Sequence, residues 1–274
     1  MGTQPLVSIC IPSYNSEKFI ACALESVLSQ SLTDFEVIIT DDYSRDGTVS
    51  VIKSFTDARI RLIQNEHNLG IGENWNKVLS CAEGKYVKLL CGDDVLYPEC
   101  LARQVDVLEA TVNAAVVLAI CNSNVIDAYN RVILRRRFPI GAGVISGVKL
   151  IRNSIRWGSN LIGEPGVGLF RKQALSKAGI SQSSNPYLID LSLWADLLKH
   201  GDAFIDTECL AGFRISGQAA SAKIGSRQAA YFRSFIRTIR RDQFYRANMF
   251  DATLGYVLSF QWCLLRNAFI NSVC

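Results

Sequence analysis

The sequence predicts an α/β fold with a mixed, largely parallel sheet, and three observations lead to this prediction. Short runs rich in β-branched residues alternate with helical patterns over the first hundred residues, as is typical of parallel strands joined by crossover helices. Hydrophobic residues make up 49% of the 274 positions, enough to bury a sizeable core. Charged residues make up only 20%, which excludes a disordered tail protein. We expect one large domain, or one domain with a small appendage.

In chain order, the first half contains four strand-helix units. A buried strand over 6–11 is expected to end at Pro12, and Asn15 or Ser16 can cap the helix that follows. The other expected strands are short apolar runs, over 35–40, 60–63, 86–90 and 114–121. The expected helices carry apolar residues on one face, over 19–28, 48–55, 71–82, 99–109 and 191–199.

The chain after residue 222 differs in composition. Between positions 222 and 266 there are eight basic residues against two acidic ones, and apolar residues fall between the arginines at helical spacing. We therefore expect a main domain over 1–222 and a basic amphipathic helical extension over 223–274. The extension either lies on an anionic membrane surface or packs its apolar face on the domain or on a second subunit. Packing is the slightly favoured alternative.

Charge and cysteine content exclude several classes of protein. A net charge of +4 is too small to argue for a nucleic-acid partner. The nine cysteines contain no Cys-x-x-Cys pair, which disfavours structural zinc and a disulfide scaffold and fits a reducing cytoplasm. The N-terminus lacks a secretion signal, and no apolar run approaches the roughly 20 residues that span a bilayer. We expect a cytoplasmic protein, or one that sits on a membrane without crossing it.

Polar residues follow the strands of the first half. Asp41 and Asp42 come after the second strand, and Asp93 and Asp94 after the fourth. Ligands of open α/β sheets bind beyond the carboxyl ends of the strands, so both pairs would face one crevice. Mg²⁺ and Mn²⁺ prefer oxygen ligands, which makes Asp93 and Asp94 candidate metal ligands; the alternative is that these acids cap helices and form turns. No Gly-x-Gly-x-x-Gly follows the first strand, which disfavours a dinucleotide enzyme.

The motifs of the first half form an ordered series. They are Pro12-x-Tyr14-Asn15, Asp41-Asp42-x-Ser44-x-Asp46-Gly47-Thr48, Asn68-x-Gly70, Asn76, Ala82-x-Gly84-x-Tyr86 and Asp93-Asp94. In order and spacing this series resembles the nucleotide-sugar-binding half of family 2 glycosyltransferases, which have the GT-A fold. The resemblance implies a mixed, mostly parallel sheet with helices on both faces, with a nucleotide-sugar half over 1–100 and an acceptor half over 101–222. It also implies an inverting enzyme that uses Mn²⁺ or Mg²⁺ to move a sugar from a nucleoside diphosphate to an acceptor hydroxyl.

The resemblance implies roles for individual residues of the nucleotide-sugar half. Tyr14 would lie against a pyrimidine ring, and Asp42, or Asp41, would accept a hydrogen bond from the imide N–H that uracil and thymine carry. The nucleotide-sugar-binding residues implied in this way are Pro12, Tyr14, Asn15, Asp41, Asp42, Asn68, Gly70, Asn76 and Asp93. Asp93 and Asp94 would hold the metal, with Asp94 the favoured ligand. The family commonly has a further acid where this chain has Cys91, and a thiol is a poor ligand for Mg²⁺.

In the acceptor half, the segment Asp190-Leu-Ser-Leu-Trp194 resembles the family's acidic helix-start motif. The resemblance makes Asp190 the general base that takes the acceptor's proton, with the tryptophan packed behind it; a helix N-cap is the alternative for this residue. Glu164 would touch the acceptor. Ser216 stands where several relatives carry a histidine, so Arg214, or basic residues such as Lys223 and Arg227, would contact the diphosphate instead.

The function implied by the resemblance is transfer from a UDP- or dTDP-sugar in bacterial surface-polysaccharide assembly. The partners would be the nucleoside-diphosphate sugar and a glycan or lipid-linked sugar acceptor, with membrane contact through 223–274 and a homodimer left open. One alternative is a non-catalytic nucleotide-sugar scaffold or sensor, which the thiol of Cys91 leaves open. A sugar nucleotidyltransferase is disfavoured, because no glycine-rich basic loop follows the first strand.

Overall fold

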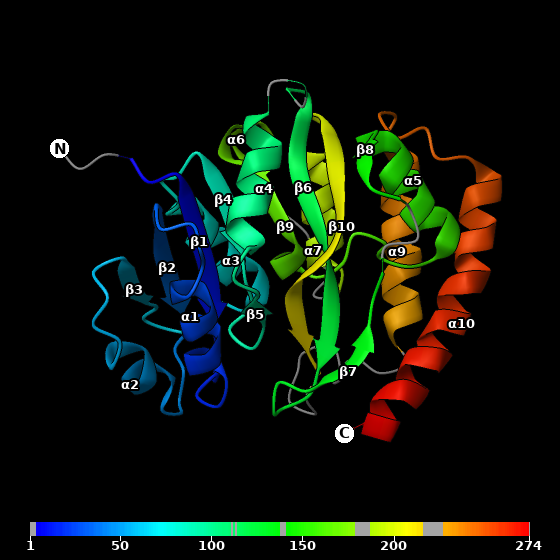
Figure 1. The fold of residues 1–274 in the computed structure, drawn as a ribbon. Helices are drawn as coiled ribbons and strands as arrows, with labels where there is room; N and C mark the ends of the chain where they lie inside the picture. Colours follow the sequence, from blue (N-terminus) through cyan, green and yellow to red (C-terminus); the bar gives the residue numbers. More distant parts are fainter. Residues whose placement is uncertain are drawn as a thin grey trace.

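One ten-stranded sheet runs through the part of the chain that the computed structural model describes, residues 4–110, 112, 114–137, 141–178, 187–215 and 227–273 (Figure 1). Its strands are β1 (Val7–Ser13), β2 (Phe35–Asp41), β3 (Ile60–Gln64), β4 (Tyr86–Leu89), β5 (Val95–Leu96), β6 (Val116–Ile126), β7 (Val132–Arg135), β8 (Gly143–Ile145), β9 (Gly168–Arg171) and β10 (Asp202–Arg214). The strand order is β3-β2-β1-β4-β9-β6-β10-β5, with β7 paired to β6 and β8 to β10. β3, β2, β1 and β4 are parallel, and β9 runs antiparallel to β4 and β6. The predicted mixed, mostly parallel sheet is confirmed.

Helices lie on both sides of this sheet in Figure 1. They are α1 (Ile20–Leu28), α2 (Thr48–Lys53), α3 (Ile71–Ser80), α4 (Cys100–Glu109), α5 (Gly147–Trp157), α6 (Lys172–Ala178), α7 (Ile189–Leu197), α9 (Gln228–Arg241) and α10 (Met249–Val273), with a 3₁₀ turn, η2 (Pro165–Val167). In the first half they cross over between parallel strands, as the alternating pattern predicts.

The start of the first helix corrects one expectation. β1 continues through Pro12 to Ser13, because β4 pairs with β1 only as far as Cys10 while β2 pairs with it to the end. α1 then begins at Ile20, and no side chain caps it. Neither Asn15 nor Ser16 is the expected side-chain cap; the carbonyl oxygen of Ser16 instead accepts the N–H groups of Phe19 and Ile20.

The second half is built on two long neighbouring strands. All eleven residues of β6 are buried, and β10 lies parallel to it over nearly its whole length. The register between β6 and β10 shifts at three places; β6 carries the extra residue at the first, beside Asp202 and Ala203, and β10 carries extra residues at the other two. Bulges break the strict alternation that marks a strand in sequence, which explains why the periodicity weakens here.

The C-terminal residues form the expected helices. α9 buries the apolar side chains Phe232, Phe235, Ile236 and Ile239 in the main core, so this face packs on the domain as one alternative predicted. α10 packs against α5 at Gly255, where a Cβ atom would lie 2.0 Å from the carbonyl oxygen of Ile155. Within the described residues no helix is both long enough and apolar enough to cross a membrane. The domain boundary at 222 lies outside the described residues, and it stays a prediction.

Candidate active site

The topology brings six strand ends to one edge of the sheet. β1 to β4 run in one direction, and β6 and β10 run in the same direction because β9 is antiparallel to both β4 and β6. Ser13, Asp41, Asp127 and Arg214 therefore lie along the same edge as the loop that follows β4. The carboxyl-end edge of the sheet thus carries residues from both halves of the chain, and a ligand crevice there stays a prediction.

Asp41, the last residue of β2, and Asp42, which follows it, are both buried, and each organises a different loop. The carboxylate of Asp41 accepts the backbone N–H of Ser44 at 3.0 Å and its hydroxyl at 2.5 Å. Asp42 accepts the backbone N–H groups of Leu69 at 2.7 Å and of Gly70 at 2.9 Å, one on each oxygen. Asp42 therefore fixes the loop before α3, and a contact of either acid with a pyrimidine stays a prediction.

The loop after β1 is joined to the loop after β2. Asn15 has a left-handed backbone, with φ of 48°; its N–H donates to Ser44 Oγ at 2.9 Å, and its side-chain oxygen accepts the N–H of Arg45 at 2.9 Å. Tyr14, next to it, is 50% exposed. Tyr14 is thus half exposed in the loop after β1, and its contact with a pyrimidine stays a prediction. Pro12 lies just inside this loop, paired with Thr40 of β2.

Asn68 and Gly70 lie in the loop that Asp42 holds. The side-chain amide of Asn68 donates to the carbonyl oxygen of Asp42 at 3.1 Å. Gly70 is the N-cap residue before α3 and has φ of 84°, a conformation that L-residues with a side chain rarely adopt. Asn76 lies on α3, half-buried, and makes a polar interaction of its own.

The loop after β4 forms a compact acidic cluster. The Cys91 Sγ atom and one carboxylate oxygen each of Asp93 and Asp94 lie within 4.8 Å of one another. Asp94 is 2% exposed; one of its oxygens accepts the backbone N–H of Arg214 at 2.9 Å, whereas the other, Oδ2, has no hydrogen-bond partner. Burial, and then the charge of Asp93, raise the pKa of Asp94 well above its ordinary value. A buried carboxylate oxygen without a donor, beside a second carboxylate, fits a divalent cation as its missing partner.

Cys91 does not fit as a ligand of a hard cation. Burial and the charges of Asp94, Asp93, Asp190 and Glu164 raise the pKa of its thiol well above the ordinary value, which disfavours the thiolate that binds metals, and sulfur is in any case a soft ligand. Of these acids, Asp190 and Glu164 belong to the second half of the chain, so their charges act on the loop that follows β4.

Arg214, the last residue of β10, is buried and is hydrogen-bonded to both acids of the cluster. Its Nε donates to the carbonyl oxygen of Asp93 at 2.7 Å, and Nη1 donates to that of Asp127 at 2.6 Å. Nη2 donates to the side-chain oxygen of Asn130 at 2.5 Å, and the guanidinium lies 4.7 Å from the ring centre of Phe19. These bonds give Arg214 a bracing role, and the predicted contact with a diphosphate stays a prediction. Ser216 lies outside the described residues.

Asp190 lies in the first turn of α7, where Leu188 and not Asp190 occupies the N-cap position. Its Oδ1 accepts the N–H of Leu191 at 2.7 Å, and Oδ2 accepts the side-chain amide of Asn160 at 2.9 Å. Burial raises the pKa of Asp190 to about 7, against the lowering effect of these hydrogen bonds. Trp194 is fully buried behind it, and its indole N–H donates to the carbonyl oxygen of Gly163 at 3.1 Å.

Glu164 is a buried acid with one oxygen engaged. It is ion-paired with Arg136, which also donates to Ser123 Oγ at 3.1 Å. The other oxygen, Oε1, has no hydrogen-bond partner. The negative charge of Glu164 raises the pKa of Asp190, so the two acids share one region.

The description "Glycosyl transferase family 2" belongs to a family model that matches residues 8–178 of this sequence. The chain belongs to glycosyltransferase family 2. The matched segment runs along the chain from β1 to α6 and includes the loops that carry both acidic pairs.

Several curated proteins are similar to part of this chain, and each of them is longer than the segment that matches. The UDP-Glc:alpha-D-GlcNAc-diphosphoundecaprenol beta-1,3-glucosyltransferase WfgD of Escherichia coli is 36% identical over 103 residues, which are 38% of this chain and 41% of that protein. Across this and three similar curated relatives, the chain spans between 40% and 62% of the relative's length.

Solved structures confirm the GT-A fold for this family 2 chain. The crystal structure of S. aureus TarS 1–349 matches with a TM-score of 0.68 and 19% identity, over 97% of this chain and 73% of that chain. The mannosyltransferase PcManGT from Pyrobaculum calidifontis matches with a TM-score of 0.67 and 17% identity, over 98% of this chain and 75% of that chain.

Two buried asparagines of this family 2 site were missed in the sequence. Asn65 donates to Asp42 Oδ1 at 2.8 Å and to the side-chain oxygen of Asn74 at 3.1 Å. Asn74 in turn donates to the carbonyl oxygen of Thr40 at 3.2 Å. The signal available was an asparagine on the apolar face of the third helix, beside Trp75, where a polar side chain needs a buried partner.

Proposed function

We propose that this chain is an inverting glycosyltransferase that moves a sugar from a UDP- or dTDP-sugar to an acceptor hydroxyl. One observation carries the proposal: the unpartnered Oδ2 of buried Asp94 lies beside Asp93 at the sheet edge, where Asp190 also acts electrostatically. The name of the Escherichia coli relative, a UDP-Glc-dependent glucosyltransferase acting on a diphosphoundecaprenol, supports a UDP-sugar and a lipid-linked sugar acceptor in surface-polysaccharide assembly. We place this reaction in the cytoplasm, at the inner face of the membrane.

The metal ligands in this proposal are Asp93 and Asp94. A divalent cation bound there, Mn²⁺ or Mg²⁺, would offset negative charge on the departing nucleoside diphosphate. The Mn²⁺ complex of the PcManGT structure supports the choice of ion. Arg214 keeps the two carboxylates in place through its bonds to the backbone of Asp93 and the side chain of Asp94.

The nucleotide would bind along the loops after β1 and β2. Tyr14 offers an exposed ring for a pyrimidine, and the buried carboxylates of Asp41 and Asp42 lie beside that loop as acceptors for the imide N–H. The remaining nucleotide-sugar contacts that we propose come from Pro12, Asn15, Asn68, Gly70, Asn76 and Asp93.

Asp190 is the proposed general base. Its carboxylate is held by Asn160 and by the N–H of Leu191, and a pKa of about 7 leaves it able to accept a proton near neutral pH. It would take the proton of the acceptor hydroxyl as the oxygen attacks the anomeric carbon from the side opposite the diphosphate, which inverts the configuration. Glu164, with its free Oε1, is the proposed acceptor contact.

Thermal shift with UDP in the presence and absence of Mn²⁺ tests the donor site, because a ligand of the native state raises the melting temperature. In wild type we expect Mn²⁺ to increase the shift produced by UDP. Asp94→Asn is nearly isosteric and should abolish that increase, whereas Asp206→Asn, far along β10 at its ion pair with Arg103, should keep it. A Mn²⁺-dependent shift of wild-type size in Asp94→Asn would contradict the metal assignment.

A non-catalytic nucleotide-sugar sensor is the second candidate, favoured by one observation: the thiol of Cys91 stands where the family commonly has an acid. Slow hydrolysis of a UDP-sugar without acceptor separates the two functions. A transferase should release UDP at a measurable rate that Asp94→Asn removes, whereas a sensor should bind the UDP-sugar and leave it intact.

A further inference from the structure

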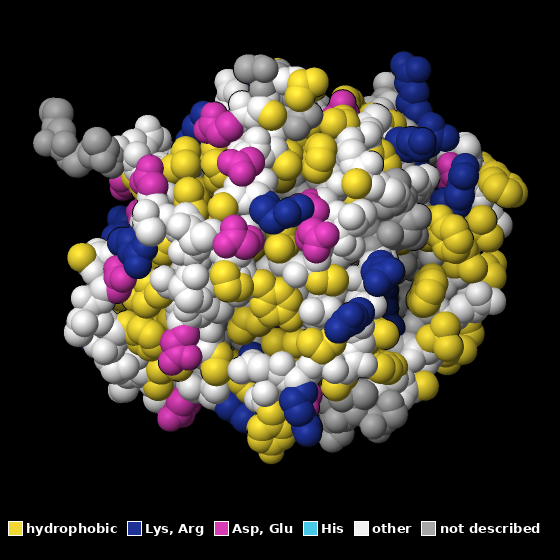
Figure 2. Space-filling view, viewed as in Figure 1, with side chains coloured by type: hydrophobic (Ala, Val, Ile, Leu, Met, Phe, Trp, Pro, Cys, Tyr) yellow, Lys and Arg dark blue, Asp and Glu magenta, His cyan; other side chains and the backbone are white. Residues whose placement is uncertain are grey.

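The outer face of α10 is apolar and has no partner in the described chain. Side chains at helical spacing on this face are half exposed or more: Phe250, Val257, Phe260, Leu264 and Leu265. The opposite face, with Ala252, Gly255 and Ser259, packs against α5 and α9. In Figure 2 hydrophobic side chains gather on the flank where Figure 1 places α10. Contiguous exposed apolar residues on a helix mark an interaction surface.

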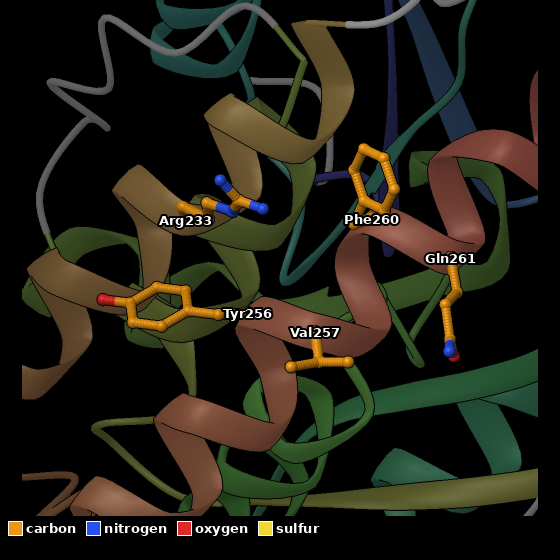
Figure 3. Close-up of a pocket in the computed structure, with 5 residues that line it drawn as sticks. All are labelled: Arg233, Tyr256, Val257, Phe260 and Gln261. Atoms are coloured by element: carbon orange, nitrogen blue, oxygen red, sulfur yellow. The ribbon is translucent and has the colours of Figure 1, made fainter.

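A shallow groove joins this apolar face to the neighbouring helix α9. The groove has a volume of about 350 Å³ and is lined by Arg233, Tyr256, Val257, Phe260 and Gln261. In Figure 3 Arg233 reaches from α9 toward α10, and Tyr256 reaches from α10 toward α9. The Nε of Arg233 is buried and has no hydrogen-bond partner, so the groove holds an unsatisfied cationic donor beside exposed aromatic and aliphatic carbon.

The exposed charge around the groove is all positive. Arg237, Arg240 and Arg241 continue the line of Arg233 along α9 and are exposed, as is Arg246 in the loop before α10. None of these five arginines is ion-paired with a carboxylate of the described residues.

Both acids of this region are already paired within the domain. Asp251 is buried against Arg152 and Arg156, and Asp242 binds Lys199. A partner that covers this surface must therefore bring negative charge and accept apolar side chains.

We propose that α9 and α10 form a docking surface for an anionic phospholipid membrane. Phe260, Leu264 and their neighbours would enter the boundary between headgroups and acyl chains, while the arginines of α9 meet lipid phosphates. A second copy of the chain fits less well, because two such surfaces would bring unpaired arginines of like charge together.

Hydrogen bonds connect the helix α10 of the docking surface to the segment that holds the candidate general base, Asp190. Arg266, one turn or less from Leu264 and Leu265 on α10, donates to Ser159 Oγ at 2.7 Å, and the next residue, Asn160, holds Asp190. A membrane on this face would thus lie near the acceptor end of the site. This consequence rests on the proposed function, whereas membrane binding itself does not.

Vesicle flotation of the full chain without nucleotide tests the proposal. We expect the chain to float with vesicles of equal parts phosphatidylglycerol and phosphatidylcholine, and to stay in the dense fraction with phosphatidylcholine alone. Arg237→Gln with Arg240→Gln should lower the partition coefficient by roughly tenfold or more, since each basic residue near the surface contributes about fivefold. Phe260→Ser with Leu264→Ser should lower it by about tenfold or more through lost apolar burial.

Matched variants on other faces serve as controls. Lys53→Gln with Lys177→Gln removes the same charge, and Tyr129→Ser with Val144→Ser removes exposed apolar side chains elsewhere. Each should float as wild type does, and all variants should keep the wild-type melting temperature. Equal loss in control and test variants would overturn the proposal. So would a dimer in sedimentation equilibrium that Phe260→Ser with Leu264→Ser dissociates while no variant floats, since a second copy would then cover α10.

Discussion

At Asp190, burial and hydrogen bonding act on one carboxylate in opposite directions. Burial disfavours the charged form and raises the pKa to about 7, whereas the donors Leu191 N–H and Asn160 Nδ2 favour the charged form. A general base is most effective when its pKa lies near the working pH. The two effects together leave a carboxylate suited to deprotonating a hydroxyl at neutral pH.

The first prediction concerns the pH dependence of transfer. The base acts only when it is deprotonated, so kcat should be low at acidic pH and rise as the pH passes about 7. Asp190→Asn should lower kcat by about 10²–10⁴-fold, because it removes the proton acceptor. UDP binding in thermal shift should stay at the wild-type level. A variant that turns over at the wild-type rate would remove Asp190 from the mechanism.

Asn160 gives a second prediction at the same scale, as a positioning residue. Asn160→Ala deletes a donor to the charged form of Asp190, so the pKa of Asp190 should rise further. The rising limb of the kcat profile should then move to higher pH than in wild type. A purely structural role would lower stability and leave the midpoint of that limb where it is.

At the scale of elements, the loop between β3 and α3 depends on one glycine. Gly70 has φ of 84°, and a Cβ atom there would meet nothing within 4 Å, so only the backbone conformation opposes a side chain. Both N–H groups that Asp42 accepts, from Leu69 and Gly70, depend on that conformation.

The third prediction follows from this conformation. Gly70→Ala should lower the free energy of unfolding by about 1–3 kcal/mol, measured by urea titration. It should also weaken UDP binding, because the loop that Asp42 fixes would shift. Gly141 is the matched control, since it too has open space around a Cβ but no positive φ. Gly141→Ala should change stability by less than about 1 kcal/mol.

The sequence predicted those strands and helices whose apolar residues form a continuous run or recur at regular helical spacing. β1 to β4 are apolar runs flanked by amphipathic helices, and each was placed within a few residues. β7, β8 and β9 are only three or four residues long, too short to show the alternation of apolar and polar residues that predicts a strand. β10 is long, but its bulges against β6 interrupt that alternation. These elements form because their partners across the sheet hold them.

At the scale of the whole molecule, Arg214 joins the two halves. It ends β10 yet binds the backbone of Asp93, 121 positions earlier, and that of Asp127 after β6. The sheet is also continuous between the halves through the pairing of β4 with β9. We therefore expect the two halves to unfold together.

Arg214→Ala gives the fourth prediction. It leaves the carbonyl oxygens of Asp93 and Asp127 without this donor in a buried site, which should cost about 3 kcal/mol. The melting temperature should fall by roughly 5–10 °C in one cooperative transition, measured by calorimetry. An unchanged melting temperature would show that Arg214 does not hold the two halves together. Two separated transitions in wild type would show that the halves do not unfold together.

The sequence by itself determined the sheet edge and the acids on it. Asp41, Asp42, Asp93 and Asp94 follow strands that all end at the same edge, so their order along the chain was enough to bring them together. Only the tertiary structure decided what the acids of the site do. Asp42 accepts hydrogen bonds from the loop before α3, and Asp94 has one oxygen without a hydrogen-bond partner. Burial raises the pKa of Asp190 to about 7. Burial and partners depend on segments distant in sequence, and no local pattern records which of them will meet.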